Sequence, residues 1–317
     1  MAVNMRRISK ILIIAASFAL VLAVLITLAI YNSRPPVLIV AEQSFIELYG
    51  RKRLRNEALF LSFSLFRPVK TVTIANEAED DIVPFAVARI SKKPYCVIFP
   101  LRFVQSAQLY REKNPNIPVV VLEGKFPESE NPSEKILGEN KSEYFIYKTD
   151  INNDFYNLGL AVSALKSKEE PKNDDSAFEN EKNDKVVFFI EQNLTQMKEI
   201  FLKGLYDRGI LIETQFFNSF SQYSEMSDLS CVILAGIGFE YLEKKTGIPV
   251  ISFTWIAPSL LPFDVVMVIN DSPWAQARQA VRMVGLGEKT GLIRSEFLVL
   301  NKKKFDKNVI AFIKKTK

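Results

Sequence analysis

Hydrophobic residues occur in short unbroken runs along most of the chain, and segments with helical periodicity lie between these runs. The continuous apolar runs are residues 37–41, 97–99, 119–122, 186–190, 232–234, 250–253 and 265–269, with weaker strand patterns at 71–75, 144–147 and 211–217. Strands buried on both faces, as in parallel sheets, have continuous rather than alternating hydrophobicity. The runs therefore predict the strands of a mostly parallel sheet structure.

The segments between the runs have the 3.6-residue periodicity of amphipathic helices. In the first of them, 45–66, Leu54, Ala58 and Leu61 recur on one face, and Pro68 ends the pattern. Further helices are expected at about 81–91, 101–113, 154–166, 194–208, 237–246, 272–285 and 305–315. Regular alternation of strands and helices predicts an α/β protein with right-handed crossovers.

The alternation occurs in two rounds, and a polar segment separates them. Residues 167–185 hold seven acidic residues and four lysines, with Ala177 and Phe178 as the apolar residues. This composition predicts a solvated insertion. We expect two doubly wound parallel-sheet lobes with a hinge and a central cleft. The expected division is a signal anchor and linker at 1–36, lobe 1 at 37–166 plus 269–289, the polar insertion at 167–185, and lobe 2 at 186–268 plus 290–317.

The N-terminal segment has the pattern of a membrane-spanning helix. Residues 11–30 are apolar except for Ser17 and Thr27, and Arg6, Arg7 and Lys10 precede them. Twenty helical residues span roughly 30 Å, the thickness of a bilayer core. Positive charge before the span predicts an N-terminus in the cytoplasm and a body outside it, as a single-pass protein of the cytoplasmic membrane.

Two other interpretations of this segment remain open. Thr27 and Ala29 form a weak cleavage motif, so a cleaved signal peptide is the serious alternative to a permanent anchor. A buried soluble helix fits less well because no charged residue interrupts the run. Residues 34–36, Arg-Pro-Pro, are expected to form a short stiff linker.

Composition and charge exclude several functions. The chain of 317 residues has no His and two Cys, which rules out Ser-His-Asp catalysis, histidine-bound zinc and a disulfide framework. The net charge of +5 comes from the two ends, because residues 37–301 hold 30 basic and 35 acidic residues. A mildly acidic body argues against nucleic-acid binding. We expect no metal, no cofactor and no enzymatic activity.

Several segments resemble parts of the type I periplasmic binding proteins, and together they cover most of residues 37–300. Residues 150–165, DINNDFYNLGLAVSAL, resemble the helix that closes the first lobe. Residues 186–190 with 197–209, MKEIFLKGLYDRG, resemble the strand and helix that open the second lobe. Residues 231–253 resemble the following strand, helix and Pro-led strand, and residues 265–284 resemble the return to the first lobe.

The resemblance implies a solute receptor of an ABC-type transporter, as in the sugar receptors and the basic-membrane-protein nucleoside receptors. The same fold forms the sensing core of lactose-repressor-type regulators. Here a membrane segment stands where such regulators have their DNA-binding domain, which disfavours that branch. The Arg that the family usually has at the start of the second-lobe helix is absent, and Gln196 and Lys198 stand nearby.

Candidate ligand residues follow from the rule that ligands bind outside the carboxyl ends of the strands in open α/β sheets. The residues so placed are Glu42, Gln43, Phe45, Arg102, Glu123, Glu191, Asn193, Asn218, Gly236, Trp255, Asn270, Asp271 and Trp274. Aromatic rings that sandwich a ligand, with amides and acids at its edge, are typical of small-molecule sites. Trp255 and Trp274 fit a cleft contact and a core position equally well. Asp271 fits a helix cap better than a ligand contact.

The favoured function is that of a membrane-anchored extracytoplasmic solute-binding protein, which closes on a small ligand by a hinge and delivers it to an ABC-type importer. Its expected partners are the small molecule, a membrane permease and the lipid bilayer around residues 11–30. A sensory or scaffold module of the same fold is the alternative, and a permanent anchor fits it equally well.

Overall fold

A computed structural model describes residues 2–125, 132–165, 185–207, 212–226, 228–256 and 258–305. The helix expected at 305–315 lies outside these residues except for Phe305, and the polar insertion lies outside them except for Lys185.

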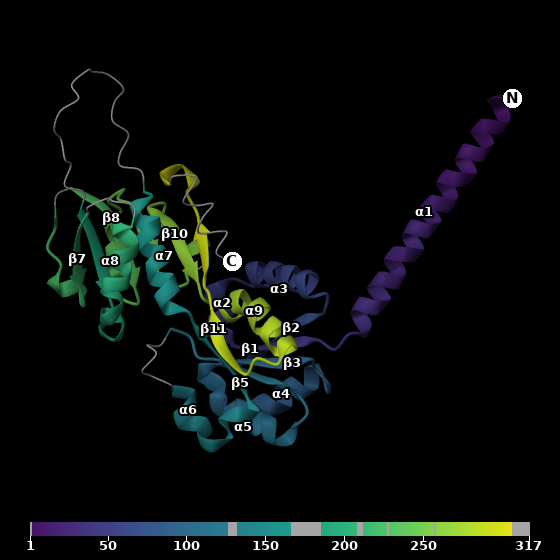
Figure 1. The fold of residues 1–317 in the computed structure, drawn as a ribbon, viewed down its shortest axis with the longest axis horizontal. Helices are drawn as coiled ribbons and strands as arrows, with labels where there is room; N and C mark the ends of the chain where they lie inside the picture. The colour runs from purple at the N-terminus through teal and green to yellow at the C-terminus, as the bar shows by residue number, and fades with distance from the viewer. Residues whose placement is uncertain are drawn as a thin grey trace.

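The chain begins with one long helix, α1, over Ala2–Ser33. Its segment Ala16–Ser33 is long and apolar enough to cross a membrane, and no part of that segment is buried in the rest of the protein. Figure 1 shows this helix, in purple, projecting away from the rest of the protein. The apolar helix expected from the sequence is therefore present, and the described lobes do not cover its segment Ala16–Ser33.

The first lobe is built on a parallel sheet in the order β11-β5-β4-β3-β1-β2. Its strands are β1 (Val37–Glu42), β2 (Val69–Ile74), β3 (Cys96–Pro100), β4 (Val119–Leu122), β5 (Phe145–Thr149) and β11 (Thr290–Ile293). Its helices are α2 (Gln43–Tyr49), α3 (Arg51–Leu65), α4 (Ile82–Ile90), α5 (Val104–Lys113), α6 (Pro132–Leu137) and α9 (Pro273–Leu286). Residues of α2, α3 and α9 pack on one face of the sheet and residues of α4 and α5 on the other. Burial on both faces explains the continuous apolar runs.

The second lobe has a sheet in the order β12-β10-β9-β8-β6-β7. Its strands are β6 (Lys185–Ile190), β7 (Glu213–Phe217), β8 (Leu229–Ala235), β9 (Val250–Ser252), β10 (Val265–Asn270) and β12 (Glu296–Val299). All pairs are parallel except β12, which runs antiparallel to β10. Helices α7 (Ile151–Ser163) and α8 (Lys198–Tyr206) pack on one face.

The structure corrects the expected place of α7. The sequence assigned 150–165 to the end of lobe 1, but Phe155 packs on Phe253 and Phe188 of the second lobe, with ring centroids 4.5 and 6.0 Å apart. Gly159 and Gly204 let α7 and α8 meet backbone to backbone, since a Cβ on either would lie little more than 2 Å from a carbonyl oxygen of the other helix. Helix α7 therefore belongs to the core of lobe 2.

The return of the chain also differs from the expected division at 289/290. After α9 the chain adds β11 to the first sheet, in register with β5, and only then crosses to β12. Neither strand was expected from the sequence: Gly291 interrupts the apolar pattern of β11, and the apolar run at 297–300, which contains most of β12, was not assigned to a strand. Within the described part of the chain, three segments thus join the lobes, at β5–α7, β10–α9 and β11–β12.

Two expected helices also differ in detail. Gly50, with φ of +88°, divides the segment 45–66 into α2 and α3. A positive φ is easily adopted by glycine and strained for other residues. The segment expected as a helix at 237–246 forms a 3-10 helix over Phe239–Lys244.

Candidate ligand-binding site

The carboxyl ends of β1 and β3 bring Glu42 and Arg102 together. The Arg102 Nε atom lies 3.3 Å from Glu42 Oε1, and the Arg102 side chain is 56% exposed. Gln43, one residue further on, is exposed and donates a hydrogen bond to Glu47 one turn along α2. The expected cleft edge of lobe 1 is therefore polar, and its charges pair with each other.

An aromatic cluster lies beside this edge, formed by Phe45, Tyr49, Trp255 and Trp274. Trp274, at the start of α9, is 3% exposed and stacks on Phe45 with ring centroids 5.7 Å apart. Its indole nitrogen donates to Thr71 Oγ1 at 3.3 Å. The structure therefore places Trp274 in the core of lobe 1, where it has no open face for a ligand.

Trp255 joins the two lobes. It follows β9 in lobe 2, yet its ring lies against Tyr49 of α2, with centroids 5.0 Å apart, and under the Arg53 guanidinium of α3, at 4.3 Å. Its indole nitrogen is buried and has no hydrogen-bond partner among the described residues. Arg53 was not among the expected site residues, because a basic residue in a basic helix turn gives no sign that it faces the other lobe.

Tyr49 holds the centre of this cluster. The Tyr49 hydroxyl donates a hydrogen bond to Glu57, and Arg53 donates to the same carboxylate at 2.9 Å. The Ser272 hydroxyl donates to the Tyr49 oxygen at 3.3 Å. Burial first, and the negative charge of Glu57 second, raise the pKa of Tyr49 well above its usual range. The phenol is thus a neutral, fixed hydrogen-bond donor.

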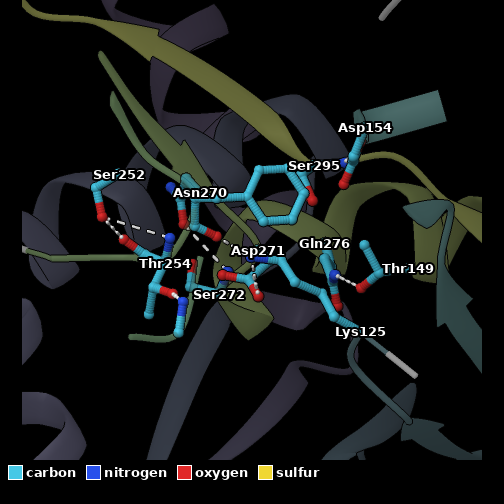
Figure 2. Close-up of polar contacts among 12 residues, drawn as sticks. Lys125, Thr149, Asp154, Ser252, Thr254, Asn270, Asp271, Ser272, Gln276 and Ser295 are labelled. Atoms are coloured by element: carbon cyan, nitrogen blue, oxygen red, sulfur yellow. Dashed lines mark hydrogen bonds and ion pairs between the residues drawn. The ribbon is translucent and has the colours of Figure 1, made fainter. Parts of the chain in front are cut away.

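Lys125, which follows β4, forms a second bridge between the lobes. Its Nζ atom lies 3.0 Å from Asp271 Oδ2, donates to the Phe253 carbonyl oxygen, and stands 4.4 Å from the centroid of the Phe253 ring. Figure 2 shows this lysine reaching toward Asp271. Asp271 was expected to cap α9, and that expectation is wrong: the helix starts at Pro273, so the cap is Ser272, which accepts from the Ala275 nitrogen at 3.3 Å.

Asn270 is fully buried at the end of β10, directly before this bridge. Its side-chain oxygen accepts a hydrogen bond from the Ser272 nitrogen at 3.1 Å. Its side-chain nitrogen is buried without a hydrogen-bond partner among the described residues. Asn270 therefore stabilises the turn between β10 and α9 by an internal hydrogen bond, and no part of its side chain is open to solvent.

A polar network ties the three crossings to each other (Figure 2). Gln276 of α9 donates to Thr149 Oγ1 at 2.8 Å, and the Ser295 nitrogen donates to Asp154 Oδ1 of α7 at 3.3 Å. Asp154 is fully buried, and burial raises the pKa of its carboxyl to about 7, against the opposing effects of Ser295 and Lys125. Nothing in the sequence separates Asp154 from other residues at helix starts.

The candidates of lobe 2 lie at the carboxyl ends of β6, β7 and β8. Asn218 donates to the Ile190 carbonyl at 2.8 Å and to Thr195 Oγ1 at 3.2 Å, so it holds two strand ends together. The Glu191 side chain lies over Gly236, where a Cβ would stand 1.9 Å from its Oε1 atom. Asn193 is exposed.

Asn218 and Gly236 also line a pocket of about 520 Å³. The other lining residues are Ser219, Phe220, Ile237, Gly238, Phe239, Glu240 and Glu243. This volume is within the usual range of small-molecule sites, about 300–1,000 Å³.

Glu123 lies apart from the other candidates. Its carboxylate is buried, accepts hydrogen bonds from the backbone nitrogen and hydroxyl of Ser133, and lies 3.7 Å from Lys148 Nζ. It borders a second pocket of about 450 Å³ against β5 and β11. The Glu123 side chain is therefore held inside lobe 1 by Ser133.

No model of a known protein family matches the chain, and no curated protein matches its sequence. Among solved structures, a transcriptional activator of the comK gene from Bacillus halodurans is similar at 11% identity and a TM-score of 0.52, over 89% of this chain and 95% of that one. Lower-scoring likenesses include a periplasmic solute-binding protein of an ABC transporter from Actinobacillus succinogenes with bound D-allose. It has 13% identity and a TM-score of 0.45, over 86% of this chain and 99% of that one. A LacI transcriptional regulator from a Rhodococcus species has 12% identity and a TM-score of 0.45, over 83% of this chain and 96% of that one.

The first of these likenesses supports the fold, and at such low identity it supports nothing finer. Together with the two six-stranded sheets and the three crossings, it confirms the expected fold, that of the type I periplasmic binding proteins.

Proposed function

We propose that the protein is a membrane-anchored extracytoplasmic solute-binding protein that holds a small molecule at the carboxyl ends of its strands and delivers it to an ABC-type importer. The observation that carries this proposal is the pocket of about 520 Å³ lined by Asn218 and Gly236, because two residues expected to contact ligand border one cavity of suitable size. Three crossings join the lobes, which suits closure by a hinge. Binding proceeds without turnover.

The proposed location rests on α1. Arg6, Arg7 and Lys10 precede its apolar segment, so the N-terminus stays in the cytoplasm and the lobes lie outside. We propose that this segment is retained as an anchor. A mature N-terminus near Ile30, measured by mass spectrometry on protein from cells, would replace the anchor with a cleaved signal peptide.

A sensory or scaffold role is the second candidate, favoured by the way Trp255 and Lys125 bridge the lobes. Both bridges use the chain's own side chains at the place where a ligand would otherwise be sandwiched. In this case the lobes report a ligand state to a membrane partner. The likeness to a protein described as a transcriptional activator is in keeping with such a role.

The test is a thermal-shift screen of the full chain in detergent with sugars, nucleosides, amino acids and short peptides. A ligand at about 100 times its Kd stabilises the folded state by about 2.7 kcal/mol, so a true ligand gives a clear shift. Asn218→Ala should weaken binding, whereas Gln192→Ala, an exposed amide that does not line the pocket, serves as the matched control. If no ligand class shifts the melting temperature, solute binding is wrong.

The same ligand then separates the candidates. If the protein serves an importer, adding it should restore uptake of the ligand into vesicles that hold the permease. The ligand should also be recovered chemically unchanged after binding. Binding without any contribution to uptake would favour the sensory role.

A further inference from the structure

The exposed face of α3 has an unusual composition for a surface helix. Phe63 and Phe60 are 77% and 69% exposed, and Leu59 and Phe66 are also exposed. The opposite side of the helix, with Leu54, Leu61 and Leu65, packs into the core of lobe 1. Contiguous exposed apolar residues on a soluble domain mark an interaction site. We call the surface formed by Lys52, Arg55, Leu59, Phe60, Phe63 and Phe66 the α3 face.

The α3 face lies directly beside the end of α1. The Phe66 ring packs edge-on against Tyr31 at 6.0 Å, and the Arg34 guanidinium stands over the same ring at 4.6 Å. Arg34 also donates a hydrogen bond to the Phe66 carbonyl oxygen at 3.3 Å. Figure 1 shows α1 leaving the lobe next to α3. Only residues 34–36 separate α1 from β1, so the α3 face cannot stand far from a membrane that α1 crosses.

The charge of the α3 face selects its partner. Lys52 and Arg55 lie one turn apart on the exposed side, before the apolar residues, and neither forms an ion pair with another residue of the described ranges. Basic residues next to exposed aromatic and aliphatic ones are the pattern of helices that lie in a lipid interface. In a symmetric contact between two copies, the same basic residues would face each other, which disfavours a second copy of this chain.

We propose that the α3 face docks on the anionic headgroups and upper acyl region of the bilayer that α1 spans. Phe60 and Phe63 enter the interface, and Lys52 and Arg55 contact lipid phosphates. Lobe 1 is then fixed on the membrane, and lobe 2 remains the part that moves. This inference rests on the anchor proposed above, and it goes beyond solute binding.

The test uses the full chain reconstituted at one copy per nanodisc, with an environment-sensitive NBD fluorophore on a single introduced cysteine. Cys96 and Cys231 are fully buried and should not react in the folded protein. The label is placed by Phe63→Cys or, as the matched control, by Phe85→Cys on α4. Phe85 is also a highly exposed phenylalanine, at 66%, on a helix of the opposite sheet face.

In nanodiscs that contain phosphatidylglycerol, the label at position 63 should emit at shorter wavelength and be quenched by spin-labelled lipids, while the label at position 85 should behave as in water. Lys52→Gln and Arg55→Gln should each weaken docking about fivefold, read as a smaller quenched fraction, because each basic residue near an anionic surface contributes about 1 kcal/mol. Phe60→Ser in the position-63 label background should reduce quenching further.

Three outcomes would overturn the proposal. Equal, water-like emission at positions 63 and 85, with the protein still eluting with the nanodiscs, would leave the anchor intact and remove the docking surface. Protein that does not elute with the nanodiscs would remove both. A label at position 63 that is protected only when two copies share a nanodisc would assign the α3 face to self-association instead of lipid.

Discussion

The ring of Trp255 lies against the ring of Tyr49, with centroids 5.0 Å apart, and this contact joins a strand end of lobe 2 to helix α2 of lobe 1. The Arg53 guanidinium lies near both rings, 4.3 Å from the centroid of Trp255 and 5.9 Å from that of Tyr49. An aromatic pair contributes about 0.5–1.5 kcal/mol beyond the area it buries, and a cation over a ring adds about 0.5–2 kcal/mol. The two lobes are therefore coupled directly by side chains of the protein itself.

Replacing each tryptophan by alanine should separate their roles. Trp274→Ala removes a fully buried ring from the lobe 1 core and should lower the free energy of unfolding by about 3–5 kcal/mol. Trp255→Ala should cost less, about 1–3 kcal/mol, because the ring is half-buried, and it should loosen the lobes relative to each other. Denaturant titration measures the first effect and small-angle scattering the second. Equal losses for the two variants would show that Trp255 is a core residue as well.

Lys125 and Asp271 should behave as a coupled pair. Lys125→Met leaves Asp271 and the Phe253 carbonyl without their shared cation, and should destabilise the fold by about 1–3 kcal/mol. Asp271→Asn alone keeps a hydrogen-bond acceptor for the lysine and should cost less. A double-mutant cycle from denaturant titrations should give a coupling free energy above about 0.5 kcal/mol. Additive losses would mean that the bridge contributes nothing to joining the lobes.

The sequence predicted the strands of both lobes well where burial imposes continuous apolar runs, and poorly where it does not. β11 is short, partly exposed and contains Gly291, so periodicity carries no signal for it, whereas the apolar run at 297–300 did mark β12 but was not assigned to a strand. The start of α7 was found, but not its lobe, because a helical pattern shows that one face is buried and not which sheet covers it. Contacts such as Phe155 with Phe253 join residues almost a hundred positions apart, and only the fold reveals them.

The candidate site was predictable by position and not by contact. The rule of strand ends selected Glu42, Arg102, Asn218 and Gly236 one by one, and the structure then pairs the first two and brings the last two to one pocket. It could not tell that Trp274 turns into the core, nor that Glu123 turns to Ser133. Lys125 follows β4 like the other candidates, but its pairing with Asp271 depends on how the lobes meet.

Gly236 offers a test of the pocket that separates steric from backbone effects. Gly236 and Gly247 both have positive φ, +84° and +73°, but a Cβ would meet Glu191 only at Gly236, and nothing within 4 Å at Gly247. Both changes to alanine should cost about 1 kcal/mol of stability through backbone strain. Gly236→Ala should in addition displace the Glu191 side chain and weaken ligand binding. Equal binding by the two variants would place the ligand away from Glu191.

Asp154 makes the junction of the lobes sensitive to pH. Its carboxyl is buried between α7 and the third crossing, where the Ser295 nitrogen donates to it. Burial raises its pKa most, and the nearby charge of Asp271 adds to that effect. Hydrogen bonds from Ser295 and the charge of Lys125 lower the pKa but are outweighed, so that the folded-state pKa is about 7 against an ordinary value of 3.8. The folded protein therefore keeps the proton of Asp154 over a range of pH in which the unfolded chain has lost it.

The contribution of Asp154 to stability should consequently fall as pH rises. Below about pH 4 both states hold the proton; between about 4 and 7 the unfolded state alone releases it; and above 7 the loss is complete, at up to about 4 kcal/mol. Asp154→Asn mimics the protonated acid, so its stability relative to the native chain should increase from pH 4 to pH 7 and then level off. Urea titrations at several pH values measure this difference.

Lys125→Met, which removes the cation that lowers the Asp154 pKa, should move the upper end of the window to higher pH. A difference between Asp154→Asn and the native chain that is constant across this range would mean that the carboxyl is ionised in the folded protein, with water or a cation at the junction of the lobes.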